Sequence, residues 1–121
     1  MQDPHPFAKS HEAPWGSWEV LLTEPGHQVK RIHVKAGKRL SYQTHAKRSE
    51  HWFVVQGSGL AVLGGKDIPL SAGQSLDVPV GAPHRMGNPG NSELIFIEVQ
   101  RGDYLGEDDI VRLDDDFGRV R

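Results

Sequence analysis

Cysteine is missing from the 121-residue chain. A disulfide framework and a thiolate metal site are therefore excluded, so a metal ion would need imidazole, carboxylate or amide ligands. The sequence also has no apolar run near the ~18 residues that a membrane-spanning helix requires, and its opening residues lack the apolar stretch of a secretory signal. We therefore expect a cytoplasmic protein with no membrane partner.

Neither sign of charge dominates the sequence. Lys and Arg number 14 against 16 Asp and Glu, which gives a net charge of -2. This balance provides no electrostatic reason to expect binding to nucleic acid. Because single domains commonly have about 100–150 residues, the length predicts one domain with no nucleic-acid partner.

Turn-forming residues divide most of the chain into short β-rich runs. Residues 1–13 are polar and interrupted by Pro4 and Pro6, so we expect a flexible N-terminal arm there and one domain over residues 14–121. In that domain, the 14 Gly and 8 Pro of the chain fall mainly between runs that are typical of strands. The predicted strands are Ser17–Thr23, Gln28–Lys35, Arg39–Thr44, Glu50–Gln56, Leu60–Leu63, Asp67–Leu70, Ser75–Val78, His84–Gly87 and Leu94–Gln100.

No window before residue 100 has the 3.6-residue period of an amphipathic helix, and many short strands favour an antiparallel sandwich or barrel. The acidic C-terminal stretch is expected to hold a helical turn around Glu107–Val111. The predicted fold class is all-β.

One predicted hairpin carries three residues that can bind a metal ion. Gln43 and His45 are two positions apart, so they lie on one face of a strand. Glu50 opens the next strand after a four-residue turn, and a hairpin neighbour lies about 5 Å away across the ladder. The spacing therefore predicts that Gln43, His45 and Glu50 surround one ion.

A second segment supplies a fourth candidate ligand. Pro79 and Gly81 form a tight turn that delivers His84 to the start of another strand. One hairpin with three ligand groups and a distant imidazole would leave coordination positions open for substrate or water, as catalytic metal sites do. We therefore predict a metal site of Gln43, His45, Glu50 and His84.

These segments resemble the two signature motifs of the cupin superfamily. The first reads G-x5-[H or Q]-x-H-x4-E-x6-G from Gly37 to Gly57, and the second reads G-x5-P-x-G-x2-H-x3-N from Gly73 to Asn88. The resemblance implies a double-stranded β-helix, or jelly-roll barrel, with one divalent metal ion. Gln43 stands where many cupins carry His, so the ion could be Zn, Mn, Co, Ni or Fe.

The resemblance narrows to the C-terminal isomerase domain of type II mannose-6-phosphate isomerases, which are often fused to a mannose-1-phosphate guanylyltransferase. It rests on segments Pro14–Val20, Lys30–Val34, Arg39–Trp52 and Glu98–Arg112. It implies a homodimeric enzyme that interconverts mannose 6-phosphate and fructose 6-phosphate. No Gly-rich loop is followed by a helix, so guanylyl transfer is not expected.

Arg39 is the remaining candidate site residue, and the sequence is compatible with two functions besides isomerisation. Arg39 has the strand parity of Gln43 and His45, which predicts that it faces the cavity. There it could act in catalysis by binding a sugar phosphate, or it could pair with a buried carboxylate. The alternatives to isomerisation are a non-catalytic sugar or sugar-nucleotide sensor and another metal-cupin enzyme, such as a dioxygenase.

Overall fold

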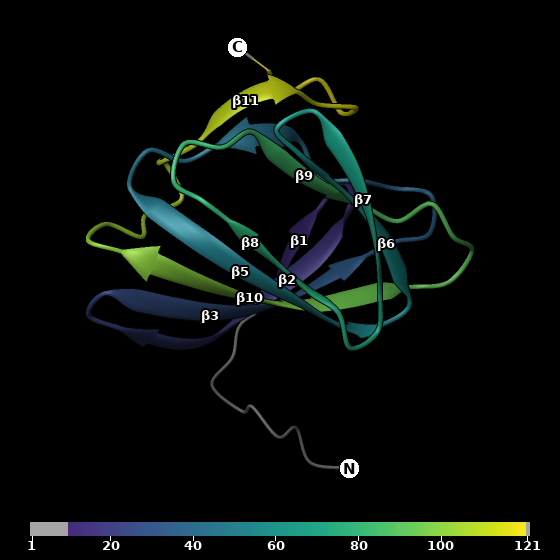
Figure 1. Cartoon of the computed structure of the whole chain (residues 1–121), viewed down its shortest axis with the longest axis horizontal. Coiled ribbons are helices and arrows are strands. Elements are labelled where there is room, and N and C mark those ends of the chain that lie inside the picture. The colour runs from purple at the N-terminus through teal and green to yellow at the C-terminus, as the bar shows by residue number, and fades with distance from the viewer. Residues whose placement is uncertain (1–9, 121) are drawn as a thin grey trace.

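The computed structural model describes residues 10–120, and these residues form eleven β-strands and no helix (Figure 1). Consequently, no helix within this range is long and apolar enough to cross a membrane. The strands are β1 (Ser10–Ala13), β2 (Gly16–Glu24), β3 (His27–Val34), β4 (Tyr42–Thr44), β5 (Arg48–Gln56), β6 (Ser58–Leu63), β7 (Lys66–Ser71), β8 (Ser75–Val78), β9 (His84–Gly87), β10 (Leu94–Gly102) and β11 (Val111–Asp114).

The strands form two antiparallel sheets that face each other around a common interior. One sheet has the order β1-β2-β3-β10-β5-β8, and the other has the order β11-β4-β9-β6-β7. Strands that are distant in the chain therefore lie side by side, as β10 does between β3 and β5 (Figure 1). This arrangement confirms the predicted all-β jelly-roll fold.

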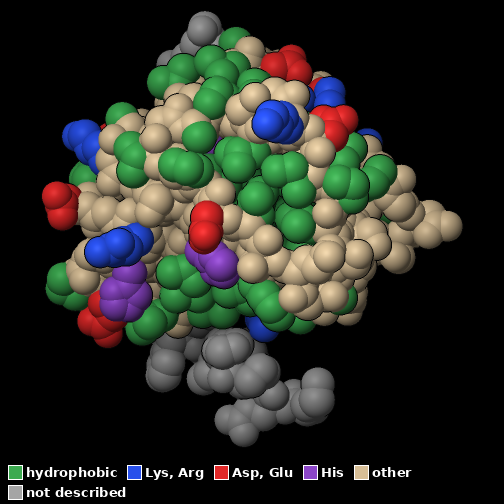
Figure 2. Space-filling model, in the orientation of Figure 1, with side chains coloured by type: hydrophobic (Ala, Val, Ile, Leu, Met, Phe, Trp, Pro, Cys, Tyr) green, Lys and Arg blue, Asp and Glu red, His purple; other side chains and the backbone are tan. Residues whose placement is uncertain are grey.

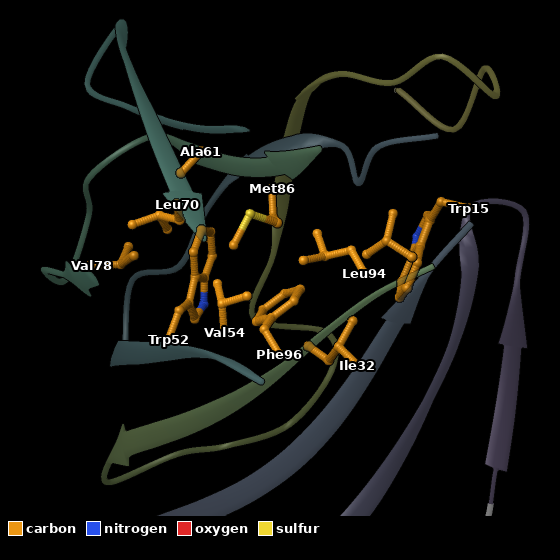
Figure 3. Close-up of a cluster of buried hydrophobic side chains, with 11 residues drawn as sticks. Trp15, Ile32, Trp52, Val54, Ala61, Leu70, Val78, Met86, Leu94 and Phe96 are labelled. Carbon is orange, nitrogen blue, oxygen red and sulfur yellow. The ribbon is translucent and has the colours of Figure 1, made fainter. Parts of the chain in front are cut away.

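The hydrophobic core lies between the sheets and fills one end of the barrel. Residues of β3 and β10 alternate between buried and half-buried positions, as the two-residue period of a strand requires. Figure 3 shows Phe96 and Leu94 of β10 packed among Ile32, Val54 and Met86. On β5, the inward face passes from Val54 and Trp52 to the polar Glu50, so the core ends where the candidate ligands begin.

The N-terminal part of the chain differs from the predicted flexible arm. Residues 10–13 of that arm form β1, which pairs with β2 through a tight turn at Pro14 and Trp15. The prolines flank this segment and do not interrupt it, so no ladder hydrogen bond is lost. Gly16 permits the close approach, because a Cβ atom there would lie 1.9 Å from the His33 carbonyl oxygen. Residues 1–9 of the predicted arm lie outside the described range.

The C-terminal segment also differs, since the helical turn predicted around Glu107–Val111 does not form. A single turn closes where the Asp109 amide donates to the Gly106 carbonyl oxygen at 3.2 Å, and β11 follows it. β11 pairs with the edge of β4. A strand edge offers a row of unpaired backbone groups, and pairing with it satisfies more of them than one isolated helical turn would.

The core position of Leu94 gives a stability test. We expect Leu94→Ala to lower the free energy of unfolding by about 2–5 kcal/mol, because it leaves a cavity among fully buried side chains. Leu113→Ala, at a side chain that is 48% exposed, should change it by no more than about 0.5 kcal/mol. Denaturant unfolding monitored by tryptophan fluorescence measures both values, and equal losses would contradict this description of the core.

Candidate metal centre

Three candidate ligands from three separate stretches of chain meet inside the barrel. His45 directly follows β4, Glu50 belongs to β5, and His84 opens β9. All three are buried, with 3–4% of each residue exposed. Their nearest ligand atoms lie within 4.8 Å of one another. The buried group His45, Glu50 and His84 could therefore hold a metal ion, as the motif spacing predicts.

The hydrogen bonds of the two imidazoles leave both Nε2 atoms as acceptors. His45 Nδ1 lies 2.6 Å from the Asp109 carbonyl oxygen, and His84 Nδ1 lies 2.9 Å from the Ala82 carbonyl oxygen. A carbonyl oxygen only accepts, so each Nδ1 carries the proton and each Nε2 presents a lone pair. Backbone carbonyls thus orient both rings, as partners outside the ligand set do in many metal sites.

These two lone pairs face the carboxylate of Glu50. Glu50 Oε2 lies 3.2 Å from His45 Nε2, and Glu50 Oε1 lies 3.6 Å from His84 Nε2. Metal–ligand bonds of about 2.0–2.1 Å in a tetrahedral site place neighbouring ligand atoms about 3.3 Å apart. Three converging acceptors repel one another unless a cation or a donor lies between them, so this donor set fits a divalent ion.

Burial keeps the imidazoles neutral. It lowers the pKa of His45 to about 4, with the Arg48 charge acting in the same direction, and it also lowers the pKa of His84. Desolvation disfavours the charged imidazolium, so both rings are unprotonated at neutral pH. Neutral imidazole is the form that binds metals, and no proton has to leave before an ion enters.

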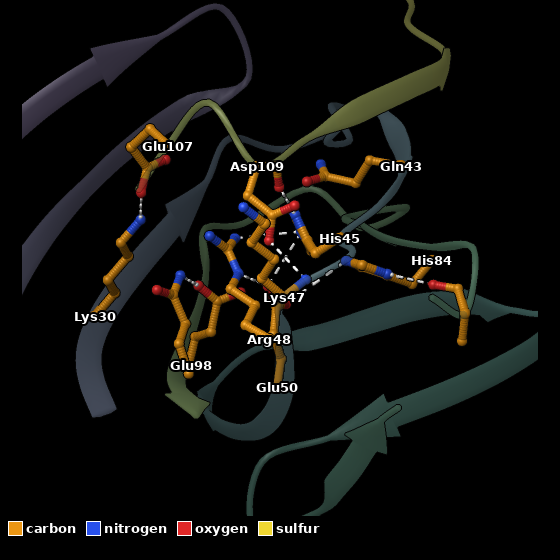
Figure 4. A network of polar contacts seen from close by, with 12 residues as sticks. Lys30, Gln43, His45, Lys47, Arg48, Glu50, His84, Glu98, Glu107 and Asp109 are labelled. Atoms are coloured by element: carbon orange, nitrogen blue, oxygen red, sulfur yellow. Dashed lines mark hydrogen bonds and ion pairs between the residues drawn. The ribbon is translucent and has the colours of Figure 1, made fainter. Parts of the chain in front are cut away.

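Gln43 lies next to His84 across the sheet. The two residues are paired in the ladder between β4 and β9, so their side chains share a face. The Gln43 amide nitrogen donates to Ser41 Oγ at 2.9 Å, and Figure 4 shows its amide oxygen on the side of His45. Gln43 is therefore close to the three-residue group, and its role as a fourth ligand remains a prediction.

Arg48 is an inward charge that the sequence reading missed. β5 begins at Arg48, which gives it the same inward parity as Glu50 and Trp52. Its Nε donates to Glu50 Oε2 at 2.9 Å, and its Nη2 lies 3.2 Å from His45 Nε2. The guanidinium is 6% exposed and supplies a positive charge beside the three acceptors.

A second buried carboxyl group is linked to Glu50 through Trp52. The indole Nε1 donates to Glu50 Oε1 at 3.0 Å and to Glu98 Oε1 at 3.1 Å. Gln100 donates to the other oxygen of Glu98 at 2.8 Å. Burial raises the pKa of Glu98 to about 7, and the neighbouring charge of Glu50 adds to this effect. Glu98 faces inward because it is paired with Trp52 in the ladder between β10 and β5.

Arg39 does not join the other predicted site residues. The prediction that it faces the cavity is wrong, because the expected strand from Arg39 to Thr44 is interrupted and only Tyr42–Thr44 is regular. The alternation of inward and outward side chains therefore does not extend from Gln43 back to Arg39. The Arg39 side chain is 46% exposed, and its Nε and Nη2 donate to Asp116 at 2.7 and 2.9 Å. A catalytic role for Arg39 gains no support from this position.

A cavity of about 270 Å³ lies beside the candidate ligands. Gln43, Arg48 and Glu98 form its inner wall, and Trp15 and Trp18 contribute aromatic surface. Lys30 and Glu107 form an ion pair at the wall, which Figure 4 shows to one side of the ligand group. The cavity is large enough for a small polar molecule, and its link to the three-residue group runs through Gln43, which is paired with His84, and Arg48, which bonds to Glu50.

A family model provides the deciding comparison. The model described as "Mannose-6-phosphate isomerase C-terminal" matches residues 3–115, which is most of the chain. The chain belongs to this family. The match confirms the resemblance found from the motifs, and it extends from residue 3 through all of β11.

Relatives of this family member include longer bacterial proteins. The chain is 44% identical over 106 residues to a mannose-1-phosphate guanylyltransferase of Klebsiella pneumoniae. It is 48% identical over 107 residues to the alginate biosynthesis protein AlgA of Pseudomonas aeruginosa and to the xanthan biosynthesis protein XanB of Xanthomonas campestris. Each alignment covers 88% of this chain but only 22–23% of the relative. The chain thus spans about a fifth of the length of these relatives.

Solved structures with the same fold have little sequence identity to this family member. The capsular polysaccharide assembling protein CapF of Staphylococcus aureus has a TM-score of 0.80 at 20% identity, over 89% of this chain and 34% of CapF. A double-stranded β-helix protein of Klebsiella pneumoniae has a TM-score of 0.71 at 19% identity, over 95% of this chain and 86% of that protein. These likenesses confirm the cupin fold alone.

The double hydrogen bond of Trp52 predicts a loss of metal affinity. Trp52→Phe keeps most of the buried ring but removes the donor shared by Glu50 and Glu98. Loss of a partner that orients a ligand typically weakens metal binding by about 10–100-fold, and we expect a loss of that size. Competition with a chromophoric chelator measures the affinity for Zn²⁺ or Mn²⁺.

Trp15→Phe serves as the matched control, because Trp15 is also buried but its indole donates no hydrogen bond to His45, Glu50 or His84. It should keep the wild-type affinity within about twofold, well below the loss expected for a missing ligand-orienting bond. The same affinity in both variants would contradict an orienting role for Trp52.

Proposed function

We propose that Gln43, His45, Glu50 and His84 hold one divalent metal ion, Zn, Mn, Co, Ni or Fe, and that the site isomerises a sugar phosphate. The favoured reaction converts mannose 6-phosphate into fructose 6-phosphate. One observation carries the proposal: three buried acceptor atoms converge beside a cavity that can admit a small polar substrate. The family description names this activity for the C-terminal domain.

The reaction moves a proton from C2 to C1 of the open-chain sugar, and a second proton from the C2 oxygen to the C1 oxygen. When bound, the metal ion would supply Lewis-acid polarisation of the carbonyl oxygen. Glu98 is the group that we assign to the carbon proton, because its carboxyl lines the cavity and is tied to Glu50 through Trp52. A general base has to reach the proton that it removes, and the place of Glu98 in the cavity wall supports this assignment.

A second candidate function is sugar or sugar-nucleotide binding without turnover. The observation that favours it is Arg48, whose guanidinium already places a positive charge between Glu50 and His45. The Klebsiella pneumoniae relative is a mannose-1-phosphate guanylyltransferase, and this chain spans only 22% of it. The two candidates differ in one measurable property, which is product formation.

The test is formation of fructose 6-phosphate from mannose 6-phosphate by the full chain, loaded in turn with each divalent metal. We expect His84→Ala to lower kcat/KM at least ~10²-fold, because it removes one imidazole ligand. His51→Ala is the matched control and should keep the wild-type rate. The His51 side chain is half-exposed outside the barrel, where it bonds to Asp77 at 2.6 Å.

Saturable binding of mannose 6-phosphate without product, with every metal, would favour the second candidate. Glu98→Gln, measured in parallel, should lower kcat and leave metal content unchanged if Glu98 moves the proton. An unchanged kcat in Glu98→Gln would remove Glu98 from the mechanism while leaving the metal centre in place.

We further propose that the chain forms a homodimer through the outer face of the six-stranded sheet. Phe53 and Val55 of β5 are 43% and 50% exposed there, and Ile97 pairs with Phe53 across the ladder. Figure 2 shows hydrophobic side chains grouped on the face where β5 and β8 lie in Figure 1. Light scattering should give twice the chain mass, and Phe53→Asp should give a monomer. A monomeric wild type would contradict the proposed homodimer.

A cytoplasmic location of the protein also stays a prediction.

A further inference from the structure

Two arginines in the cavity wall carry nitrogen atoms that have no hydrogen-bond partner within residues 10–120. These atoms are Arg48 Nη1 and Arg112 Nε, and both are buried. Both residues line the cavity beside the candidate metal centre. A buried donor without a partner is costly, and native structures rarely leave one unexplained. The cavity wall therefore holds two positively charged groups, and each has a buried N–H donor without a hydrogen-bond partner in the described residues.

The other basic groups of the wall are already paired. Lys30 is bound to Glu107, and Arg119 donates through Nε and Nη2 to Asp115 at 2.6 and 3.1 Å. Arg48 uses Nε and Nη2 on Glu50 and His45, which leaves Nη1. Among the basic residues of the wall, Arg48 and Arg112 are therefore the ones with a buried donor left for an anion.

The register of the smaller sheet places Arg112 in line with the candidate ligands. Arg112 of β11 is paired with Gln43 of β4, and Gln43 is paired with His84 of β9. Paired residues of neighbouring antiparallel strands point to the same face, about 5 Å apart. Arg112 thus lies one strand beyond Gln43, at a distance from His84 that the length of a small sugar can span.

We propose that Arg48 Nη1 and Arg112 Nε bind the phosphate of the sugar phosphate, and that this anion site positions the sugar carbons beside the metal centre. Two guanidinium groups suit a phosphate because their planar N–H donors match its oxygens. Both donors are buried, and both residues belong to the wall of the cavity. This inference rests on the proposed sugar-phosphate substrate, and it replaces Arg39 by Arg112 as the phosphate anchor.

Calorimetric titration of the full chain with mannose 6-phosphate, mannose and inorganic phosphate tests the proposal without any turnover. Wild type should bind mannose 6-phosphate at least ~10-fold more tightly than mannose, as charge-assisted hydrogen bonds to an anion require. Arg112→Met should abolish this preference and leave mannose binding unchanged. Inorganic phosphate should compete with mannose 6-phosphate in wild type and fail to compete in Arg112→Met.

Arg101→Met and Arg39→Met are the controls, because Arg101 is exposed and Arg39 is paired with Asp116 outside the cavity wall. Both should keep the wild-type preference. Loss of the preference in Arg39→Met alone would overturn the proposal and restore Arg39 as the anchor. Arg112→Met should also unfold at the wild-type denaturant concentration, and a failure to fold would show a structural partner for Arg112 and overturn the proposal.

The titration also separates this inference from the isomerase proposal. An Arg112-dependent preference for mannose 6-phosphate without formation of fructose 6-phosphate would keep the anion site and remove the isomerase. Product formation with an unchanged KM in Arg112→Met would keep the isomerase and remove the anion site. Arg112→Lys retains the charge but loses the planar fork, and it should recover only part of the preference.

Discussion

Three acceptor groups face one another in the interior of this barrel, and they repel one another. The surrounding structure is organised around this repulsion. The lone pairs of His45 and His84 and the carboxylate of Glu50 converge at 3.2–3.6 Å, in a region from which water is largely excluded. Electrostatic repulsion is strong where the local dielectric is low. Two neighbours offset this repulsion, because Arg48 and Trp52 each donate a hydrogen bond to the Glu50 carboxylate.

The same constraint explains where the apolar core stops. Along β5, the inward positions change from Val54 to Trp52, which is apolar in its rings and polar at Nε1, and then to Glu50 and Arg48. The strand therefore passes from a dry core to a charged centre within four inward residues. Trp52 joins the two regions, because its rings pack near Phe96 and its nitrogen serves both buried carboxyl groups.

Much of the fold and the ligand group could be predicted from the sequence, because both depend on local patterns. Turn residues delimit the strands, and the two-residue period places Glu50 inward once its strand is recognised. The positions of the arginines could not be predicted in this way. The inward parity of Arg48 depends on β5 starting at residue 48, and Arg39 lies beyond an interruption of the strand that leads to Gln43.

The position of Arg112 depends on a contact between distant parts of the chain. β11 pairs with β4, about 70 residues earlier, and this pairing alone decides which side chains of the tail face inward. The tail sequence is acidic and has no clear period, so local propensity predicts a helical turn there. Strand addition at a sheet edge is a tertiary effect that overrides such weak preferences.

The orientation of both imidazoles by main-chain oxygens has a consequence for how this site tolerates mutation. The partners of His45 and His84 are the carbonyl groups of Asp109 and Ala82, and these groups persist whatever side chain stands at either position. Alanine substitution at residue 109 would therefore leave the carbonyl group that orients His45 in the chain. Changes that move the backbone, such as a proline or a deletion in the tail, would break the contact. At residue 109 the side chain helps to hold the backbone in place, because its carboxylate accepts from the Ala46 and Lys47 amides at 2.9 and 3.0 Å.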